Sequence, residues 1–172
     1  MFLIDTNIFL EILLEQEKKD ECLKLVELVL KGKVEAVVTV FTIYSIAVIL
    51  TPQKLLGFLI EFLSDLRSFI GLRLVNTSLD DKLRIARLAK EKGFDFDDAY
   101  QYYIAGSHNL KIVSFDRDFD KGNRLHKTYT NISSTSQQIV EGDKQKENKV
   151  RDHTRVETQL GRPLQLLGTL LP

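Results

Sequence analysis

The sequence predicts an α/β fold built around a parallel sheet. Four short apolar runs, at residues 1–4, 34–40, 72–75 and 110–115, have the length and composition of buried strands. The segments between them are longer and place apolar residues three and four positions apart, which is the spacing of an amphipathic helix. Strands that alternate with helices predict parallel pairing with right-handed crossover connections.

The composition is that of a soluble globular protein. The chain has 172 residues, 44% of them apolar and 28% charged, which suffices for one domain with a hydrophobic core. The formal net charge of +0 argues against a passive nucleic-acid coat protein, but not against an enzyme that binds phosphate through metal ions. The single cysteine, Cys22, excludes an intramolecular disulfide and a cysteine-built metal site.

Neither a signal peptide nor a membrane span is expected. The N-terminus lacks the basic region of a signal peptide, and the longest apolar stretches, near 36–50 and 55–63, contain polar interruptions. We therefore expect a protein of the reducing cytoplasm that makes no membrane contact.

Two helices and a second strand are expected after the opening strand. Helices are predicted over residues 8–15 and 18–30, and Gly32 occupies the position that a C-terminal cap favours. The β-branched run at 34–40 predicts the second strand.

An apolar segment at 42–50 predicts the next helix, with Thr39 or Thr42 as its cap. Pro52 suits the first turn of another helix over 53–70, which carries a wide apolar stripe. Burial in the core is the favoured interpretation of this stripe. Contact between two copies in a purely structural dimer is the alternative.

The second half of the predicted domain repeats the strand–helix order. A strand at 72–75 is followed by a helix that opens at Ser78 or Leu79 and runs to Gly93. A helix over 98–107 and a strand at 110–115 complete the pattern.

The character of the sequence changes near residue 130. We expect residues 1–130 to form the α/β domain and residues 131–172 to be a polar, poorly ordered tail, because 141–159 contains almost no apolar anchor. The tail ends in a leucine-rich patch, interpreted either as a segment that docks on a partner or as a reading-frame artefact: Leu164, Leu166, Leu167, Leu170 and Leu171.

Three aspartates fall at equivalent places in this pattern. Asp5 follows the first strand, Asp98 lies in the first turn of a helix, and Asp116 follows the last strand. Strand carboxyl ends and helix amino ends share one edge of a parallel sheet, so these acids can meet there. An all-oxygen cluster favours Mg²⁺ or Mn²⁺ over zinc, and phosphodiester hydrolysis is the chemistry that fits such a cluster. Helix capping alone is the alternative role for each acid.

Three motifs resemble those of the PIN-domain family, in order and at similar separations. They are Ile4-Asp5-Thr6-Asn7, Phe96-Asp97-Asp98-Ala99 and Ser114-Phe115-Asp116-Arg117-Asp118-Phe119. Within the family, the length is similar to that of the VapC-type toxins of toxin–antitoxin pairs. The resemblance implies a PIN-like three-layer α/β/α sandwich and a ribonuclease that depends on Mg²⁺ or Mn²⁺. It also implies a cognate antitoxin, an RNA substrate and a homodimer.

The resemblance also implies roles for individual residues. The catalytic and metal-binding acids would be Asp5, Asp98 and Asp116. Asn7 and Ser114 match small polar positions that orient these acids or a bound water, and Asp97 and Asp118 are close enough to assist. Alternatively, Asp97 caps the helix over 98–107 and Asp118 lies in a solvated turn.

One position departs from the family pattern. The family usually has a glutamate on the helix after the second strand, where this chain has Ser45. A site with one fewer negative charge should bind a metal more weakly, although Glu61 or Asp97 could compensate. Two interpretations follow: a weakened or one-metal nuclease, and a PIN-fold module that binds RNA or a partner without cutting.

Basic residues are frequent within and after the last predicted strand, near the predicted active-site edge of the sheet. They could contact an RNA backbone, and an ordinary charged surface is the alternative for each of them. They are Lys111, Arg117, Lys121, Arg124 and Lys127.

Overall fold

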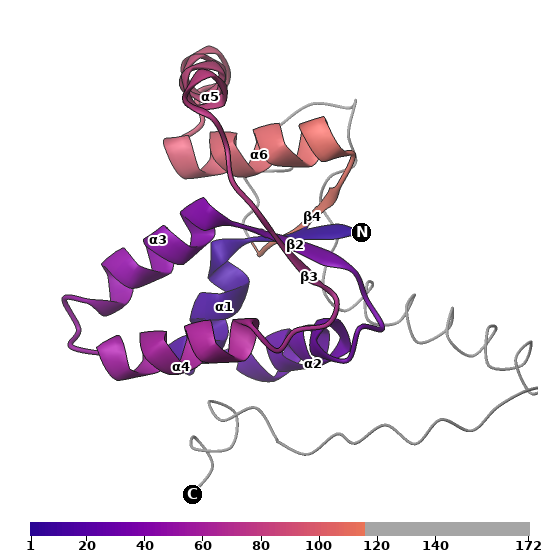
Figure 1. Cartoon of the computed structure of the whole chain (residues 1–172). Helices are drawn as coiled ribbons and strands as arrows, with labels where there is room; N and C mark the ends of the chain where they lie inside the picture. Colours follow the sequence, from indigo (N-terminus) through magenta and orange to yellow (C-terminus); the bar gives the residue numbers. More distant parts are fainter. Residues whose placement is uncertain (116–172) are drawn as a thin grey trace, which may run out of the picture.

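The computed structural model describes residues 1–115 of the chain. The domain boundary predicted at residue 130 and the predicted tail lie outside these residues. Within the described part the elements are β1 (Phe2–Ile4), α1 (Thr6–Leu13), α2 (Lys19–Leu30), β2 (Ala36–Thr39), α3 (Val40–Leu50), α4 (Leu56–Leu66), β3 (Leu72–Val75), α5 (Leu79–Lys92), α6 (Phe96–His108) and β4 (Lys111–Val113) (Figure 1). None of the described helices is long and apolar enough to cross a membrane.

The strands form one parallel sheet in the order β3-β2-β1-β4, which confirms the predicted parallel pairing. Phe2 of β1 pairs with Ala36 on one side and with Lys111 on the other, so β1 is an inner strand. Because the strands run in the same direction, their carboxyl ends share one edge. Asp5, directly after β1, therefore lies near the middle of that edge.

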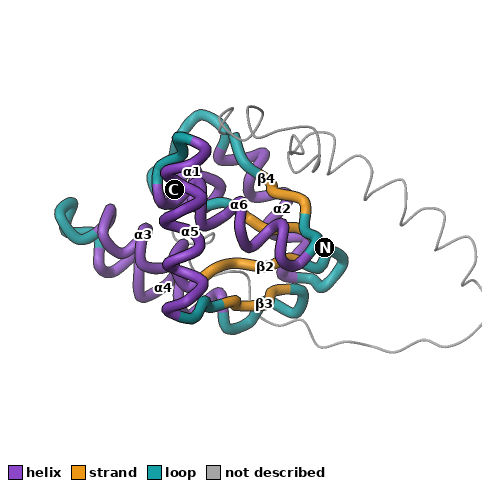
Figure 2. The backbone as a smooth tube through the Cα atoms, turned by 90° about the horizontal axis from the view of Figure 1, so that it is seen from above, coloured by secondary structure: helices purple, strands orange, loops and turns teal. Residues whose placement is uncertain are grey.

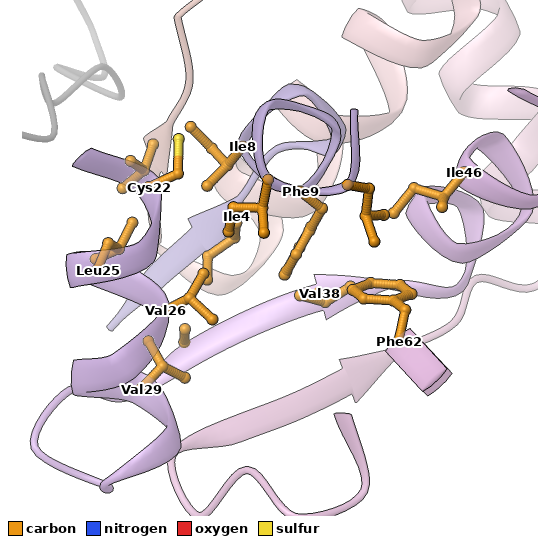
Figure 3. Packing of buried hydrophobic residues seen from close by; sticks show 14 of the residues in the cluster. Ile4, Ile8, Phe9, Cys22, Leu25, Val26, Val29, Val38, Ile46 and Phe62 are labelled. Atoms are coloured by element: carbon orange, nitrogen blue, oxygen red, sulfur yellow. The ribbon is translucent and has the colours of Figure 1, made fainter. Parts of the chain in front are cut away.

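Helices cover both faces of the sheet, so the predicted α/β/α layering is confirmed (Figure 1). Successive strand residues point to opposite faces. Leu3 packs in a buried cluster with residues of α5 and α6, whereas Ile4 packs with residues of α1 to α4. Figure 3 shows the second cluster, in which Ile4 and Val38 of the sheet face Phe62 and the side chains of α1 and α2.

The α3–α4 pair extends to one side of the sheet (Figures 1 and 2). The predicted helix over 53–70 was too long at both ends. Pro52 lies in a turn, and Lys54 has a positive φ of 60°, so the chain enters α4 only at Leu56. At the other end, the N–H of Ile70 donates to the carbonyl oxygen of Leu30 at 3.2 Å, because the chain already turns toward the sheet.

The apolar stripe of α4 divides between core and surface. Phe62 is its one fully buried residue and meets Phe9 edge to face at 5.2 Å between ring centroids. Phe58, Leu59 and Leu66 are half-buried against the same cluster. Three apolar residues of the predicted stripe are exposed, namely Leu56, Leu63 and Ile70, and so is Ile60 beside them. The core interpretation is therefore correct for one side of this helix only.

Other element ends follow their caps. The first helix begins at Thr6 instead of residue 8, because Asp5 caps it. The side chain of Thr39 caps α3 by accepting from the N–H of Thr42, which confirms one of the two predicted caps. Helix α6 begins at Phe96 with Asp95 as its cap, so the alternative in which Asp97 is the cap was wrong.

Gly71 permits a close approach of two backbone segments. A Cβ atom at this position would lie 2.1 Å from the carbonyl oxygen of Val34 and 2.8 Å from that of Val29. The N–H of Gly71 donates to Val29, and its carbonyl accepts from Ala36. Glycine therefore lets β3 start directly beside the loop that leads into β2.

Candidate active site

Asp5 is buried at the carboxyl end of β1, with 7% of its surface exposed. Its N–H donates to the carbonyl oxygen of Val113, which continues the pairing with β4. Its Oδ1 accepts from the N–H of Thr6 at 2.6 Å, and its Oδ2 accepts from the hydroxyl of Ser114 at 2.5 Å. Both carboxylate oxygens are thus held in fixed directions at the edge of the sheet.

Asn7 extends this arrangement by one step. Its side-chain amide donates to the Ser114 hydroxyl at 2.8 Å, and that hydroxyl donates to Asp5. The structure therefore brings together Asp5, Asn7 and Ser114, which the sequence predicted to act together. An Asn–Ser–Asp chain fixes the rotamer of the acid and leaves its negative charge stabilised from one side.

The environment of Asp5 disfavours its charged form. The pKa of the carboxyl is raised from 3.8 to about 7. Burial is the largest cause, and the negative charges of Asp97 and Asp98 add to it, whereas the hydrogen bonds from Ser114 and Thr6 lower the pKa. The larger of the two electrostatic effects comes from Asp97. Near neutral pH this acid is therefore poised to exchange its proton for a cation.

Helix α6 brings Asp97 and Asp98 toward Asp5. Asp95 caps the helix by accepting from the N–H of Asp98 at 2.8 Å. The first turn is fixed by aromatic packing: Phe41 stacks on Tyr100 at 4.9 Å and meets Phe96 at 5.7 Å between ring centroids. These contacts anchor the acidic first turn of α6 to the start of α3.

Asp97 is partly buried, which raises its pKa to about 6. The charge of Asp95 also raises this pKa, whereas a hydrogen bond from the Gln101 side chain lowers it. Gln101 is fully buried and its Nε2 donates to the hydroxyl of Thr42 at 3.0 Å. Sequence reasoning assigned Gln101 no role, although an amide on an apolar helical face four residues after an acid was a usable signal.

Four buried side-chain oxygens have no hydrogen-bond partner in the described part of the chain. They are Thr6 Oγ1, Asn7 Oδ1, Asp97 Oδ1 and Gln101 Oε1. Thr6 and Asn7 directly follow Asp5 in the sequence, and Asp97 and Gln101 lie on α6. Unpaired buried oxygens are costly unless a cation or ordered water meets them, so the donor set fits a hard cation such as Mg²⁺ or Mn²⁺.

The described residues do not complete a metal site. Among residues 1–115, no group of three His, Cys, Asp or Glu side chains is arranged to hold a metal ion. The compensation for Ser45 expected from Glu61 or Asp97 stays a prediction. Ser45 is half-buried on α3 and brings no charge. The further predicted ligand, Asp116, lies outside the described residues.

Lys111 is the one residue of the predicted basic cluster that lies within the described part of the chain. Lys111 pairs with Phe2 at the start of β4, whereas Val113, beside Ile4, leads to Ser114. Lys111 therefore lies at the amino edge of the sheet, roughly 10 Å along the strand from the acids, and its placement beside them was wrong. The other residues of the basic cluster lie outside the described part: Arg117, Lys121, Arg124 and Lys127. Asp118, predicted as an assisting acid, also lies outside it.

Comparison with known proteins agrees with the observed fold. The model of the PIN domain family matches residues 2–125. A toxin–antitoxin complex from Klebsiella pneumoniae is similar in structure, with a TM-score of 0.55 and 19% identity over 77% of this chain and 98% of that chain. A protein from Pyrobaculum aerophilum has a TM-score of 0.54 and 19% identity over 81% and 96% of the two chains. No curated protein sequence matches the chain.

Proposed function

This chain belongs to the PIN-domain family, and on that premise we propose that it is a ribonuclease that hydrolyses RNA phosphodiester bonds with a bound Mg²⁺ or Mn²⁺. PIN domains are generally nucleases that use divalent metal ions. Asp5, Asp98 and Asp116 are the proposed metal-binding and catalytic acids. Asn7 and Ser114 orient Asp5, Asp97 assists, and Asp118 is a further candidate.

The observation that carries this proposal is the environment of Asp5. Asp5 is buried, accepts hydrogen bonds from Ser114 and Thr6, and has a pKa of about 7 with two negatively charged neighbours. Its charged form opposes folding, so a purely structural role does not explain this acid. A divalent cation would relieve the repulsion, polarise a phosphoryl oxygen and lower the pKa of a bound water. The protein residues fix the direction of the carboxylate oxygens and limit the access of bulk water to Asp5.

The direct test is cleavage of single-stranded RNA by the purified full chain with Mn²⁺. We expect cleavage that chelation removes and that Asp5→Asn abolishes. Asp20→Asn is the matched control, since it removes an exposed carboxylate from α2. Activity that persists in Asp5→Asn or in excess chelator would show that a contaminant cuts the RNA.

A toxin role is the more specific form of the proposal. The similarity to a protein solved as a toxin–antitoxin complex supports a cognate antitoxin. A homodimer, which the family resemblance implies, and a cytoplasmic location are part of the same proposal. We expect the neighbouring gene to encode a small DNA-binding protein that blocks RNA cleavage when it is co-expressed. A neighbour that leaves cleavage unchanged would argue against the toxin role.

A second candidate function is binding of RNA or of a partner without cleavage. Ser45, which stands where the family usually has an acid, favours this alternative. RNA that is retained intact by the protein in saturating Mn²⁺ would identify it. Measurable turnover that depends on Asp5 would exclude it.

A further inference from the structure

Three aromatic rings contact one another where α3 and α6 begin. The ring of Phe41 stacks on that of Tyr100 at 4.9 Å between centroids. The ring of Phe96 meets these two at 5.7 Å and 6.2 Å, tilted by 58° and 59° to them. Phe41 lies in the first turn of α3, and the other two residues lie near the start of α6. We call these three residues the aromatic cluster.

The strand register places the aromatic cluster at the edge of the sheet that carries Asp5. Strands β1 and β2 pair in parallel, and continuing their register brings Asp5 level with Thr39 at the carboxyl edge. Phe41 follows Thr39 by two residues. Phe96, which contacts Phe41, directly precedes two of the predicted acids in the first turn of α6. The aromatic cluster and these acids therefore share the carboxyl edge.

The aromatic cluster is fixed by buried neighbours and exposed at one of its rings. Tyr100 is fully buried, and its hydroxyl lies 2.8 Å from that of Thr77. Phe41 is half-buried against the same core. Phe96 remains 38% exposed. Helix capping does not explain Phe96, because Asp95 caps α6. An exposed aromatic side chain in a fixed position thus lies at the edge of the proposed active site.

An unpaired nucleobase is the ligand that suits this ring. A base is uncharged and stacks on any aromatic face, whereas the carboxylates of Asp97 and Asp98 repel a phosphate that has no cation beside it. A ring that is fixed before binding loses little conformational entropy when a base stacks on it. Bases of a duplex are stacked between their neighbours, so only unpaired RNA offers a base that can be splayed onto the ring.

We propose that Phe96 stacks on an unpaired base of the RNA, with Phe41 and Tyr100 fixing its ring, and that this contact selects single-stranded RNA. This inference rests on the proposed ribonuclease function and deepens it, because it names the substrate class and a residue that recognises it. A base and its phosphate belong to one nucleotide. The stacked base therefore also determines which phosphate reaches the acids.

The first test is the affinity of the full chain for a short fluorescent single-stranded RNA, measured by anisotropy in a chelator that prevents metal-dependent cleavage. Phe96→Leu keeps an apolar side chain but removes the ring. We expect it to weaken RNA binding by about 5- to 150-fold, the range for loss of one base–aromatic stack. Phe96→Tyr keeps the ring and should stay within about twofold of the wild type. Ile60→Ala is the matched control, because Ile60 is an exposed apolar residue of α4, in the other helical layer.

A second test reports on the contact itself. The chain contains no tryptophan, so Phe96→Trp introduces a single indole at the proposed contact. Stacking of a base on this indole should quench its fluorescence, and the quenching should saturate together with the anisotropy. Double-stranded RNA of the same sequence should leave the fluorescence unchanged. His108→Trp is the control, because His108 is exposed at the other end of α6. If Phe96→Leu does not fold, the fluorescence of Phe96→Trp decides.

Three results would overturn the inference. The first is an RNA affinity of folded Phe96→Leu within about twofold of the wild type, which would leave the ring as a cover of the core or a contact for a protein partner. The second is constant fluorescence of Phe96→Trp while the anisotropy shows bound RNA. The third is absence of RNA binding in the chelator, because stacking requires no cation.

These results are distinguishable from failure of the proposed function. Cleavage that depends on Mn²⁺ and Asp5 would keep the ribonuclease even if Phe96 makes no contact with a base. A chain that binds single-stranded RNA through Phe96 but never cleaves it would refute the nuclease alone.

Discussion

Asp5→Asn should stabilise the metal-free protein at neutral pH while it abolishes activity. Burial raises the pKa of Asp5 from 3.8 to about 7, so the folded state retains a proton that the unfolded state has lost between these values. Stability therefore falls as the pH rises from about 4 to about 7, and stays level above that range. A pKa difference of about 3 corresponds to about 4 kcal/mol of unfolding free energy.

Asparagine resembles the protonated acid in shape and charge, and its Oδ1 can still accept from the N–H of Thr6. We expect the variant to exceed the wild type by up to about 4 kcal/mol at pH 8, with water entry around the charged carboxylate reducing this value. The two proteins should have nearly equal stability near pH 4. Functional sites often contain groups that lower stability, and a buried carboxylate that opposes folding is such a group.

The assay is urea unfolding of both proteins between pH 4 and 8 with a chelator present. Addition of Mn²⁺ should then stabilise the wild type and leave Asp5→Asn unchanged, because a ligand stabilises only the state that binds it. A stability difference that is independent of pH would refute the reasoning from burial. A variant less stable than the wild type at pH 8 would show that the Ser114 hydrogen bond outweighs the burial penalty.

Two other predictions concern Gly71 and Ser45. Gly71→Ala should lower the unfolding free energy measured in urea by about 3 kcal/mol, because the new methyl group would collide with the carbonyl oxygens of Val34 and Val29. A loss below about 1 kcal/mol would mean that β3 moves aside easily. Ser45→Glu should raise Mn²⁺ affinity and the cleavage rate, since it adds an anionic ligand where the family usually has one. An unchanged Mn²⁺ affinity in titration calorimetry would place residue 45 outside the site.

The local signals in the sequence located several elements closely. The strand predicted at 72–75 is β3 with the same ends, and Ser78 caps α5, which ends at Gly93 in the left-handed conformation. These ends depend on neighbouring residues along the chain: a capping box at one end and a glycine at the other. By contrast, α4 is shorter than its apolar period, because the path of the chain back to the sheet overrides the helical pattern near residue 70.

The sequence by itself determined the alternation of strands and helices and the position of Asp5 between β1 and α1, because both follow from the order of apolar and polar residues. Tertiary structure alone decided which partners Asp5 and Gln101 have. The hydrogen bond between Asp5 and Ser114 joins residues 109 positions apart, and that between Gln101 and Thr42 spans 59 positions. Such pairs have no local signature, since they form only when the parallel sheet brings separate strand ends and helix starts to one edge.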